Sequence, residues 1–220
     1  MSKAQKVVDR LVKIYGHPAQ REDAPFHVLV RTILSQNTNY RNTRIACENL
    51  FSKFQTPEQI ANADINELTA LLRPAGLHNI KARRIKDISK LIVEGHNLSK
   101  LVHKNVDVAR NDLLKIKGIG PKTADCILLF AGGHAVLPVD THVFRIAKRL
   151  GLAPADADHE KVKVALERQI SPEKRGAAHI ALISFGREFC RARNPGCGEC
   201  PLLDLCESRD SFLDRSLSNK

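Results

Sequence analysis

The chain has 220 residues, of which 43% are hydrophobic and 27% are charged, as in an ordinary globular protein with a sizeable core. It contains no stretch of the ~20 apolar residues that a membrane span needs and no signal-peptide pattern, so we expect a cytoplasmic protein. The formal net charge of +11 favours a polyanionic partner, most simply nucleic acid. Because only 5% of residues are aromatic and none is tryptophan, a DNA duplex suits this chain better than stacked single strands.

Apolar residues recur at helical spacing along most of the chain, and no alternating strand pattern of useful length is present. The sequence therefore predicts an all-α protein of about ten short helices. Helices are expected over residues 7–15, 25–34, 40–54, 80–94, 158–170 and 172–185, and others should open at capping boxes over 56–59 and 64–67. The helix over 80–94 is predicted to present a solvated basic face, formed by Lys81, Arg83, Arg84, Lys86 and Lys90.

Residues 113–124 are expected to form a helix, a tight turn and a second helix. Gly118 can adopt the positive φ that ends a helix, and Pro121 suits the first position of the next one. Backbone N–H groups in such a turn can bind an anion, and phosphate is the usual one. A plain connection between two helices is the alternative interpretation.

Four further residues have ordinary interpretations on pattern alone. Lys122 projects opposite the apolar stripe of its helix, which predicts a solvated lysine. Asp140 precedes another helical pattern and reads as its N-cap. Leu77 reads as a core residue in the turn over 76–79, and Gln36 as a capping or surface amide.

Four of the six cysteines lie close together as a C-x6-C-x2-C-x5-C pattern, formed by Cys190, Cys197, Cys200 and Cys206. In a cytosolic chain such a group is typical of a metal site, and both zinc and a 4Fe–4S cluster take four cysteines. The loop between the first two contains Arg191 and Arg193, which could clamp a DNA backbone phosphate. Cys47 and Cys126 stand alone inside helical patterns and are expected to be small buried hydrophobes.

Five motifs occur together, in an order that spans residues 34–206: Leu34-Ser35-Gln36-Asn37-Thr38, Gly76-Leu77-His78-Asn79, Lys117-Gly118-Ile119-Gly120-Pro121-Lys122-Thr123-Ala124, Val139-Asp140-Thr141-His142, and the four cysteines. In this combination the chain resembles endonuclease III-type members of the helix-hairpin-helix DNA glycosylase superfamily. The acid of the Val-Asp-Thr-His motif follows the hairpin lysine by eighteen residues, which is part of the resemblance. The resemblance covers nearly the whole chain.

The resemblance implies a role for each motif. Lys122 would be the nucleophile and Asp140 its acidic partner, while Gln36 and Leu77 would fill the gap left by an extruded base. The four cysteines would hold a 4Fe–4S cluster, with zinc a distant second. The amides around the turn would grip a DNA phosphate, and these belong to Lys117, Gly118, Ile119 and Gly120.

The implied activity is base-excision repair. A lysine that attacks C1′ of the sugar releases an oxidised pyrimidine through a Schiff base, and β-elimination then cleaves the abasic strand. The expected partner is double-stranded DNA with damaged bases or abasic sites, bound by a monomer at the nucleoid and not at a membrane. The implied lobes are 20–133, with the hairpin, and 1–19 plus 134–220, with the cluster.

Two other functions stay open at this point. A monofunctional glycosylase for G·U or G·T mismatches would share the fold, but such relatives often replace the nucleophilic lysine, which this chain keeps as Lys122. A non-catalytic module that only senses DNA structure would need neither Lys122 nor Asp140 at this spacing.

Overall fold

A computed structural model describes residues 1–16 and 24–212, and within these ranges the chain is helical without strands, which confirms the all-α prediction. None of the described helices is long and apolar enough to cross a membrane. The α-helices are α1 (Lys3–Tyr15), α2 (Pro25–Leu34), α3 (Tyr40–Phe51), α4 (Pro57–Asn62), α5 (Ile65–Leu71), α6 (His78–Val93), α7 (Leu98–Val102), α8 (Val106–Lys115), α9 (Pro121–Phe130), α10 (Thr141–Arg149), α11 (His159–Gln169) and α12 (Arg175–Glu188).

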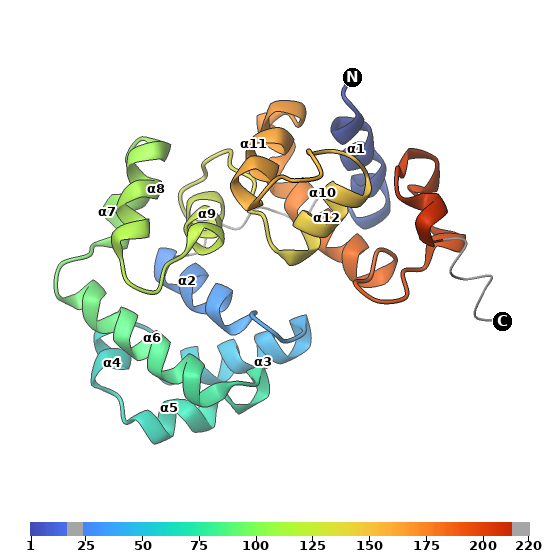
Figure 1. The fold of residues 1–220 in the computed structure, drawn as a ribbon. Coiled ribbons are helices and arrows are strands. Elements are labelled where there is room, and N and C mark those ends of the chain that lie inside the picture. The colour runs from blue at the N-terminus through green and yellow to red at the C-terminus, as the bar shows by residue number, and fades with distance from the viewer. Residues whose placement is uncertain (17–23, 213–220) are drawn as a thin grey trace. The chain divides into compact units, whose positions relative to one another are not determined.

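The chain divides into two compact units, one of residues 21–134 and the other of residues 1–20 with 135–220. The first unit contains α2 to α9, and the second contains α1 and α10 to α12 (Figure 1). The second unit is thus built from both ends of the chain.

In the unit of residues 21–134, α9 packs against both α2 and α8 (Figure 1). Seven successive residues of α9, from Thr123 to Leu129, are buried, so this helix is covered on all sides except near its ends. The α2 helix begins with Pro25 at its first turn and buries most of its length in the same core. A helix that is buried on nearly all sides belongs in the centre of a unit, and α9 fills that place.

In the other unit, α12 packs against α1 and α10, and its core draws on all four helices. The close approach of α12 to α10 depends on Gly186, because a Cβ there would lie 2.8 Å from His142 Nδ1. Salt bridges tie α1 to the C-terminal segment, Lys3 with Glu207 and Arg10 with Asp204. The segment that carries the cysteines is therefore fixed to helices from both ends of the chain.

The helix caps form as predicted where the sequence carries strong capping signals. Thr56 and Gln59 form the predicted capping box of α4, and the Asp64 side chain accepts from the first turn of α5. Several helix boundaries differ from the prediction: α1 begins at Lys3, α3 ends at Phe51, α6 begins at His78, and α12 spans Arg175–Glu188. The short α7 was not predicted, because five residues are too few to establish a period. The sequence also predicts that Gly16 and Pro18 close the first helix, and Pro18 lies outside the described residues.

The prediction of a solvated face on the basic helix is wrong for Lys81, which is 4% exposed in the core of its unit. Arg84 and Lys86 are half-buried, and only Arg83 and Lys90 are exposed as predicted. Cys126 is buried as expected, whereas Cys47 is half-buried. Burial raises the pKa of the Cys47 thiol to about 11, so this cysteine is a poor nucleophile at neutral pH.

Candidate nucleic-acid interface and iron–sulfur site

The predicted hairpin joins α8 to α9. Helix α8 ends at Lys115, Gly118 takes φ +97°, and Pro121 occupies the first turn of α9 with Gly120 as N-cap. A Cβ at Gly118 would lie 3.0 Å from Ile88 Cδ1, so both the backbone conformation and the space there require glycine. The turn thus directs the N-terminus of α9, with its positive dipole end, outward next to Gly120.

The hairpin residues differ in their exposure and in whether their backbone amides already form hydrogen bonds. Lys117 and Gly118 are exposed, whereas the Ile119 side chain is 4% exposed. The Ile119 amide donates to the Ile116 carbonyl at 3.0 Å and so is engaged within the turn. Lys122, the second residue of α9, is half-buried. It is thus less exposed than the helical pattern predicts, and the residues that follow it are buried.

Leu77 is not a core residue. It is 53% exposed, and its backbone lies in the left-handed region at φ 48° and ψ 32°, immediately before α6. A leucine in that conformation costs about 1–2 kcal/mol relative to ordinary backbone. An apolar side chain that is both strained and exposed contributes little to the core of the free protein, which indicates a role outside it.

Gln36 lies in the same unit, just after α2. Its backbone carbonyl accepts from Lys81 Nζ at 2.6 Å, and its side-chain Oε1 accepts from Arg84 Nη1 at 3.1 Å. Lys81 Nζ also donates to the carbonyls of Leu34 at 2.9 Å and Ala75 at 2.8 Å. One buried ammonium therefore fastens the segment of Gln36 to the segment that leads into Leu77.

Sequence reasoning missed the role of Lys81, although a signal existed. Positions 81, 82, 85, 88 and 89 form the buried stripe of α6, so a lysine at the first of these falls on the apolar face. A lysine there is buried only if carbonyls satisfy its three N–H groups. Burial lowers the pKa of Lys81, while the three carbonyls favour its charged form.

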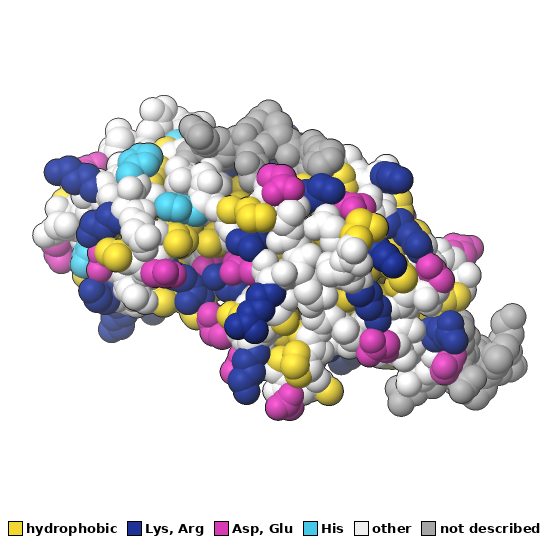
Figure 2. All heavy atoms as spheres, turned by 90° about the horizontal axis from the view of Figure 1, so that it is seen from above, with side chains coloured by type: hydrophobic (Ala, Val, Ile, Leu, Met, Phe, Trp, Pro, Cys, Tyr) yellow, Lys and Arg dark blue, Asp and Glu magenta, His cyan; other side chains and the backbone are white. Residues whose placement is uncertain are grey.

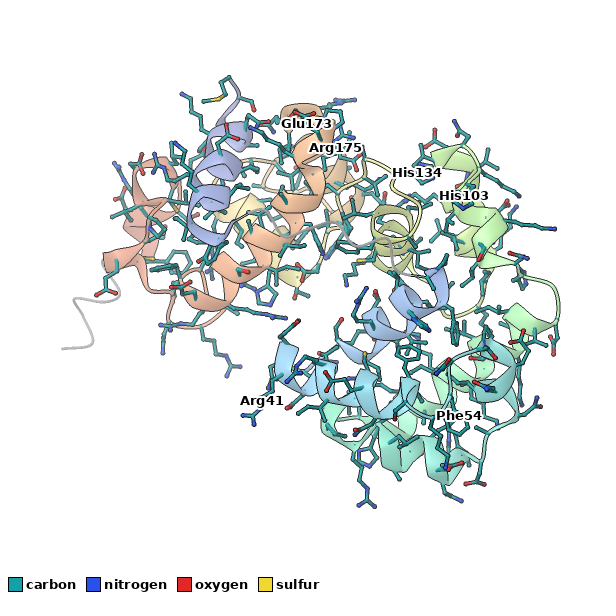
Figure 3. The ribbon with its side chains drawn as sticks, turned by 180° about the vertical axis from the view of Figure 1, so that it is seen from behind. Arg41, Phe54, His103, His134, Glu173 and Arg175 are labelled. Atoms are coloured by element: carbon teal, nitrogen blue, oxygen red, sulfur yellow. The ribbon has the colours of Figure 1, made fainter. Side chains whose placement is uncertain are left out.

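Charged side chains near this region continue the basic character of the chain. Arg41, at the start of α3, points away from its helix, next to Tyr40, which is 70% exposed (Figure 3). On the face drawn in Figure 2, lysine and arginine side chains are interspersed with acidic ones and do not form a single patch. The net charge of +11 therefore does not by itself locate the DNA contact.

Asp140 caps α10, as its sequence position predicts. Its Oδ1 accepts from the backbone N–H groups of His142 and Val143, both at 2.9 Å. Burial lowers the pKa of His142, and Arg145 donates to its Nδ1 at 3.1 Å, which suits a neutral imidazole. The carboxylate is thus held by the first turn of a helix, where the helix dipole favours negative charge.

The four cysteines follow α12 and line one hollow, together with apolar side chains that include Phe185 and Leu203. Arg149 binds this segment at several points: Nη1 donates to Cys190 Sγ at 3.4 Å and to the Arg191 carbonyl at 2.7 Å, and Nη2 to the Ala192 carbonyl at 3.1 Å. Arg191 itself donates to the Asn194 carbonyl, while Arg193 is exposed.

This hollow fits a multi-iron cluster. Four cysteines and apolar side chains line it, and four thiolates in an apolar hollow are the ligand set that a 4Fe–4S cluster takes. Burial raises the pKa of the thiols of Cys197, Cys200 and Cys206, so bound iron must supply the charge that keeps them as thiolates.

Two family models match this chain. Residues 30–172 match the family of HhH-GPD superfamily base excision DNA repair proteins, and residues 190–206 match the iron-sulfur binding domain of endonuclease III. The two matches include the hairpin, Asp140 and all four cysteines. The fold and the sites therefore define a base-excision DNA glycosylase of the helix-hairpin-helix class.

Similar proteins identify the family within this class. The chain is 36% identical over 187 residues to endonuclease III of Thermotoga maritima, covering 85% of this chain and 84% of that protein. A trapped endonuclease III–DNA covalent intermediate superposes with a TM-score of 0.81 at 30% identity, over 97% of this chain and 99% of that one. The chain belongs to the endonuclease III family, whose members are DNA glycosylases with AP lyase activity and a 4Fe–4S cluster.

A thermostable thymine-DNA glycosylase shares the fold with a TM-score of 0.78, but at 19% identity this likeness concerns the fold alone. The match of residues 190–206 to the iron-sulfur binding domain of endonuclease III supports a 4Fe–4S cluster as the cofactor, rather than zinc.

Proposed function

We propose that this chain excises oxidised pyrimidines from duplex DNA and then cleaves the abasic strand, with Lys122 as the nucleophile. The observation that carries the proposal is the position of Lys122 in the first turn of α9, two residues after Gly120 of the hairpin. A lysine there lies beside the amides that would hold a backbone phosphate, so one anchored nucleotide brings its sugar to the amine.

The chemistry needs no group beyond a neutral amine and a carboxylate. The Lys122 Nζ lone pair forms a bond to C1′ as the glycosidic C1′–N bond breaks, and the base leaves with its bonding electrons and takes up a proton. The sugar ring then opens as the C1′–O4′ bond breaks: O4′ gains a proton, Nζ loses one, and a Schiff base forms between Nζ and C1′. The imine makes the 2′ proton acidic, and its removal expels the 3′ phosphate by β-elimination.

Asp140 would stabilise the positive charge that develops on the sugar, or accept the proton of the attacking amine. Both tasks need an ionised carboxylate in a fixed orientation. The two N–H donors of His142 and Val143 support this role, because they fix Oδ1 at the start of α10.

Leu77 and Gln36 would occupy the duplex when the damaged base is extruded, since an enzyme cannot reach C1′ of a stacked nucleotide. The exposed leucine would replace the stacking of the lost base, and the glutamine would hydrogen-bond the orphaned partner. The strained, outward conformation of Leu77 and its link to Gln36 through Lys81 support this pairing.

For the backbone grip, we propose that the exposed turn at Lys117 and Gly118, with the amide of Gly120, contacts a phosphate. Ile119 would then act through its buried side chain, which anchors the turn. Arg193 is the better candidate for a second phosphate contact, because Arg191 already donates to the Asn194 carbonyl.

The unit of residues 21–134 would then provide the nucleophile and the wedge, and the unit of 1–20 with 135–220 would provide Asp140 and the cluster. We expect the cluster to be chiefly structural, to hold the loop of Arg191 and Arg193 in place, and the protein to act as a monomer on nucleoid DNA.

Borohydride trapping tests the proposal. We expect the wild type to form a covalent complex with a duplex that contains an oxidised pyrimidine, and Lys122→Gln to lose it while retaining affinity for DNA. Lys90→Gln is the control, since it removes an exposed charge on α6 that has no part in the proposed site, and it should still trap. Base release without any trapped species would establish the monofunctional alternative, and binding without base release would establish the non-catalytic one.

A further inference from the structure

The Gln36 amide is held from the protein side in one orientation. Arg84 Nη1 donates to Gln36 Oε1 at 3.1 Å, so the carbonyl end of the amide is occupied and the NH2 end is left to face away from Arg84. The backbone on the same residue is fixed as well, because Lys81 Nζ binds the Gln36 carbonyl at 2.6 Å. The side chain therefore has little freedom to turn about its terminal bond.

Arg84 is itself restrained. Its Nη2 donates to the Gly118 carbonyl at 2.5 Å, so the guanidinium bridges the hairpin turn and the Gln36 side chain. A planar guanidinium that binds two acceptors through different nitrogens has a defined plane, which a flexible ammonium would not have. Arg84 is also half-buried, between the exposed Arg83 and the buried Ile85.

An amide that can rotate by 180° offers either an acceptor or a donor to a partner base. An amide whose oxygen is held toward Arg84 presents its N–H groups on the opposite side, so it favours a base with an acceptor at the facing position. A base with a donor there would leave two N–H groups opposed, which costs affinity.

We propose that Arg84 is a positioning residue that fixes the Gln36 amide as a hydrogen-bond donor and so makes the protein discriminate among the bases opposite the lesion. This deepens the proposed function, because it rests on Gln36 entering the duplex. Arg84 acts through Gln36 and the hairpin and need not touch the DNA base itself.

The test measures binding of the full-length protein to four duplexes that differ only in the base opposite a tetrahydrofuran abasic-site analogue. Dissociation constants are measured by fluorescence anisotropy at one salt concentration, since affinity for DNA depends steeply on salt. The readout is the ratio of the weakest to the tightest opposite base. This ratio does not move when a variant merely loses folded protein or overall charge.

We expect a ratio of about five or more for the wild type, the effect of one hydrogen bond. In Arg84→Met the released amide can rotate, and the ratio should fall below about two. Arg83→Met, the adjacent and exposed charge, should weaken all four duplexes by the same factor and keep the wild-type ratio. Gln36→Leu should give the same low ratio as Arg84→Met, and the double variant should lower it no further.

A wild-type ratio near one, an unchanged ratio in Arg84→Met, or a retained ratio in Gln36→Leu would each overturn the proposal. Because the tetrahydrofuran sugar has no base to release and cannot form a Schiff base, the ratio is independent of catalysis. Failure of borohydride trapping would reject the role of Lys122 and leave this test of Arg84 intact.

Discussion

Lys81→Met removes the ammonium that joins the segments of Gln36 and Leu77 but keeps the aliphatic stem that packs in the core. Two of the three carbonyls that Lys81 binds, those of Leu34 and Ala75, accept buried hydrogen bonds from its Nζ. Each buried carbonyl left without a partner costs about 1–3 kcal/mol, and the relief of burying a charge offsets part of that sum. We therefore expect a loss of about 3 kcal/mol in the free energy of unfolding.

For a chain of this length, such a loss lowers the melting temperature by roughly 6–12 °C. Thermal and urea unfolding, followed by circular dichroism, measure it. Since every bond of Lys81 lies within residues 21–134, only the transition of that unit should shift if two transitions resolve. Lys90→Met, exposed on the same helix, is the control and should change stability by less than about 0.5 kcal/mol. A Lys81→Met protein as stable as this control would refute the claim that the buried lysine fastens the two segments.

The other predictions concern backbone strain and pH. Leu77→Gly should leave the free energy of unfolding unchanged or raise it by up to about 1 kcal/mol, because glycine relieves the strain of φ 48° and the lost side chain is half-exposed. The same variant should lower kcat/KM for lesion DNA more than tenfold. A destabilised but fully active variant would contradict this. Gly118→Ala should destabilise the protein by about 1–3 kcal/mol in urea unfolding, since φ +97° and Ile88 Cδ1 at 3.0 Å both oppose a Cβ; an unchanged midpoint would show that the turn relaxes freely. Hydrogen bonds from Lys104 and Lys115 lower the pKa of Asp112 to about 2, so its contribution to stability is fully present above the ordinary pKa of 3.8 and is lost as the pH falls through about 2. Carboxyl NMR titration checks this, and a titration midpoint near 3.8 would mean that the two lysines do not hold the carboxylate in solution.

The sequence predicted those parts of the fold that have local signals. Pro25, Pro121 and the capping box at Thr56 are read correctly, because capping and φ restriction act within a few residues. The N-cap role of Asp140 and the grouping of the four cysteines follow from spacing in the same way. Local chemistry therefore suffices for helix starts that carry a capping or proline signal and for the grouping of the cysteines.

What could not be predicted depends on contacts distant in sequence. Lys81 reads as one more charge on a basic helix until the carbonyls of Leu34 and Gln36, more than forty residues earlier, are brought to it. Leu77 reads as core, since hydrophobicity alone does not reveal that its backbone turns it outward. Lys122 reads as a surface lysine, and only its place within a family of motifs distinguishes it from the other lysines of the hairpin.

The central claim is that Lys122 becomes covalently attached to the sugar of the excised nucleotide. Peptide mapping by mass spectrometry of the borohydride-reduced adduct, formed with a duplex that carries an oxidised pyrimidine, tests it most directly. We expect a single modified peptide, with the deoxyribose remnant on Lys122 Nζ. An adduct on Lys117 or any other amine, or complete base release with no adduct, would contradict it.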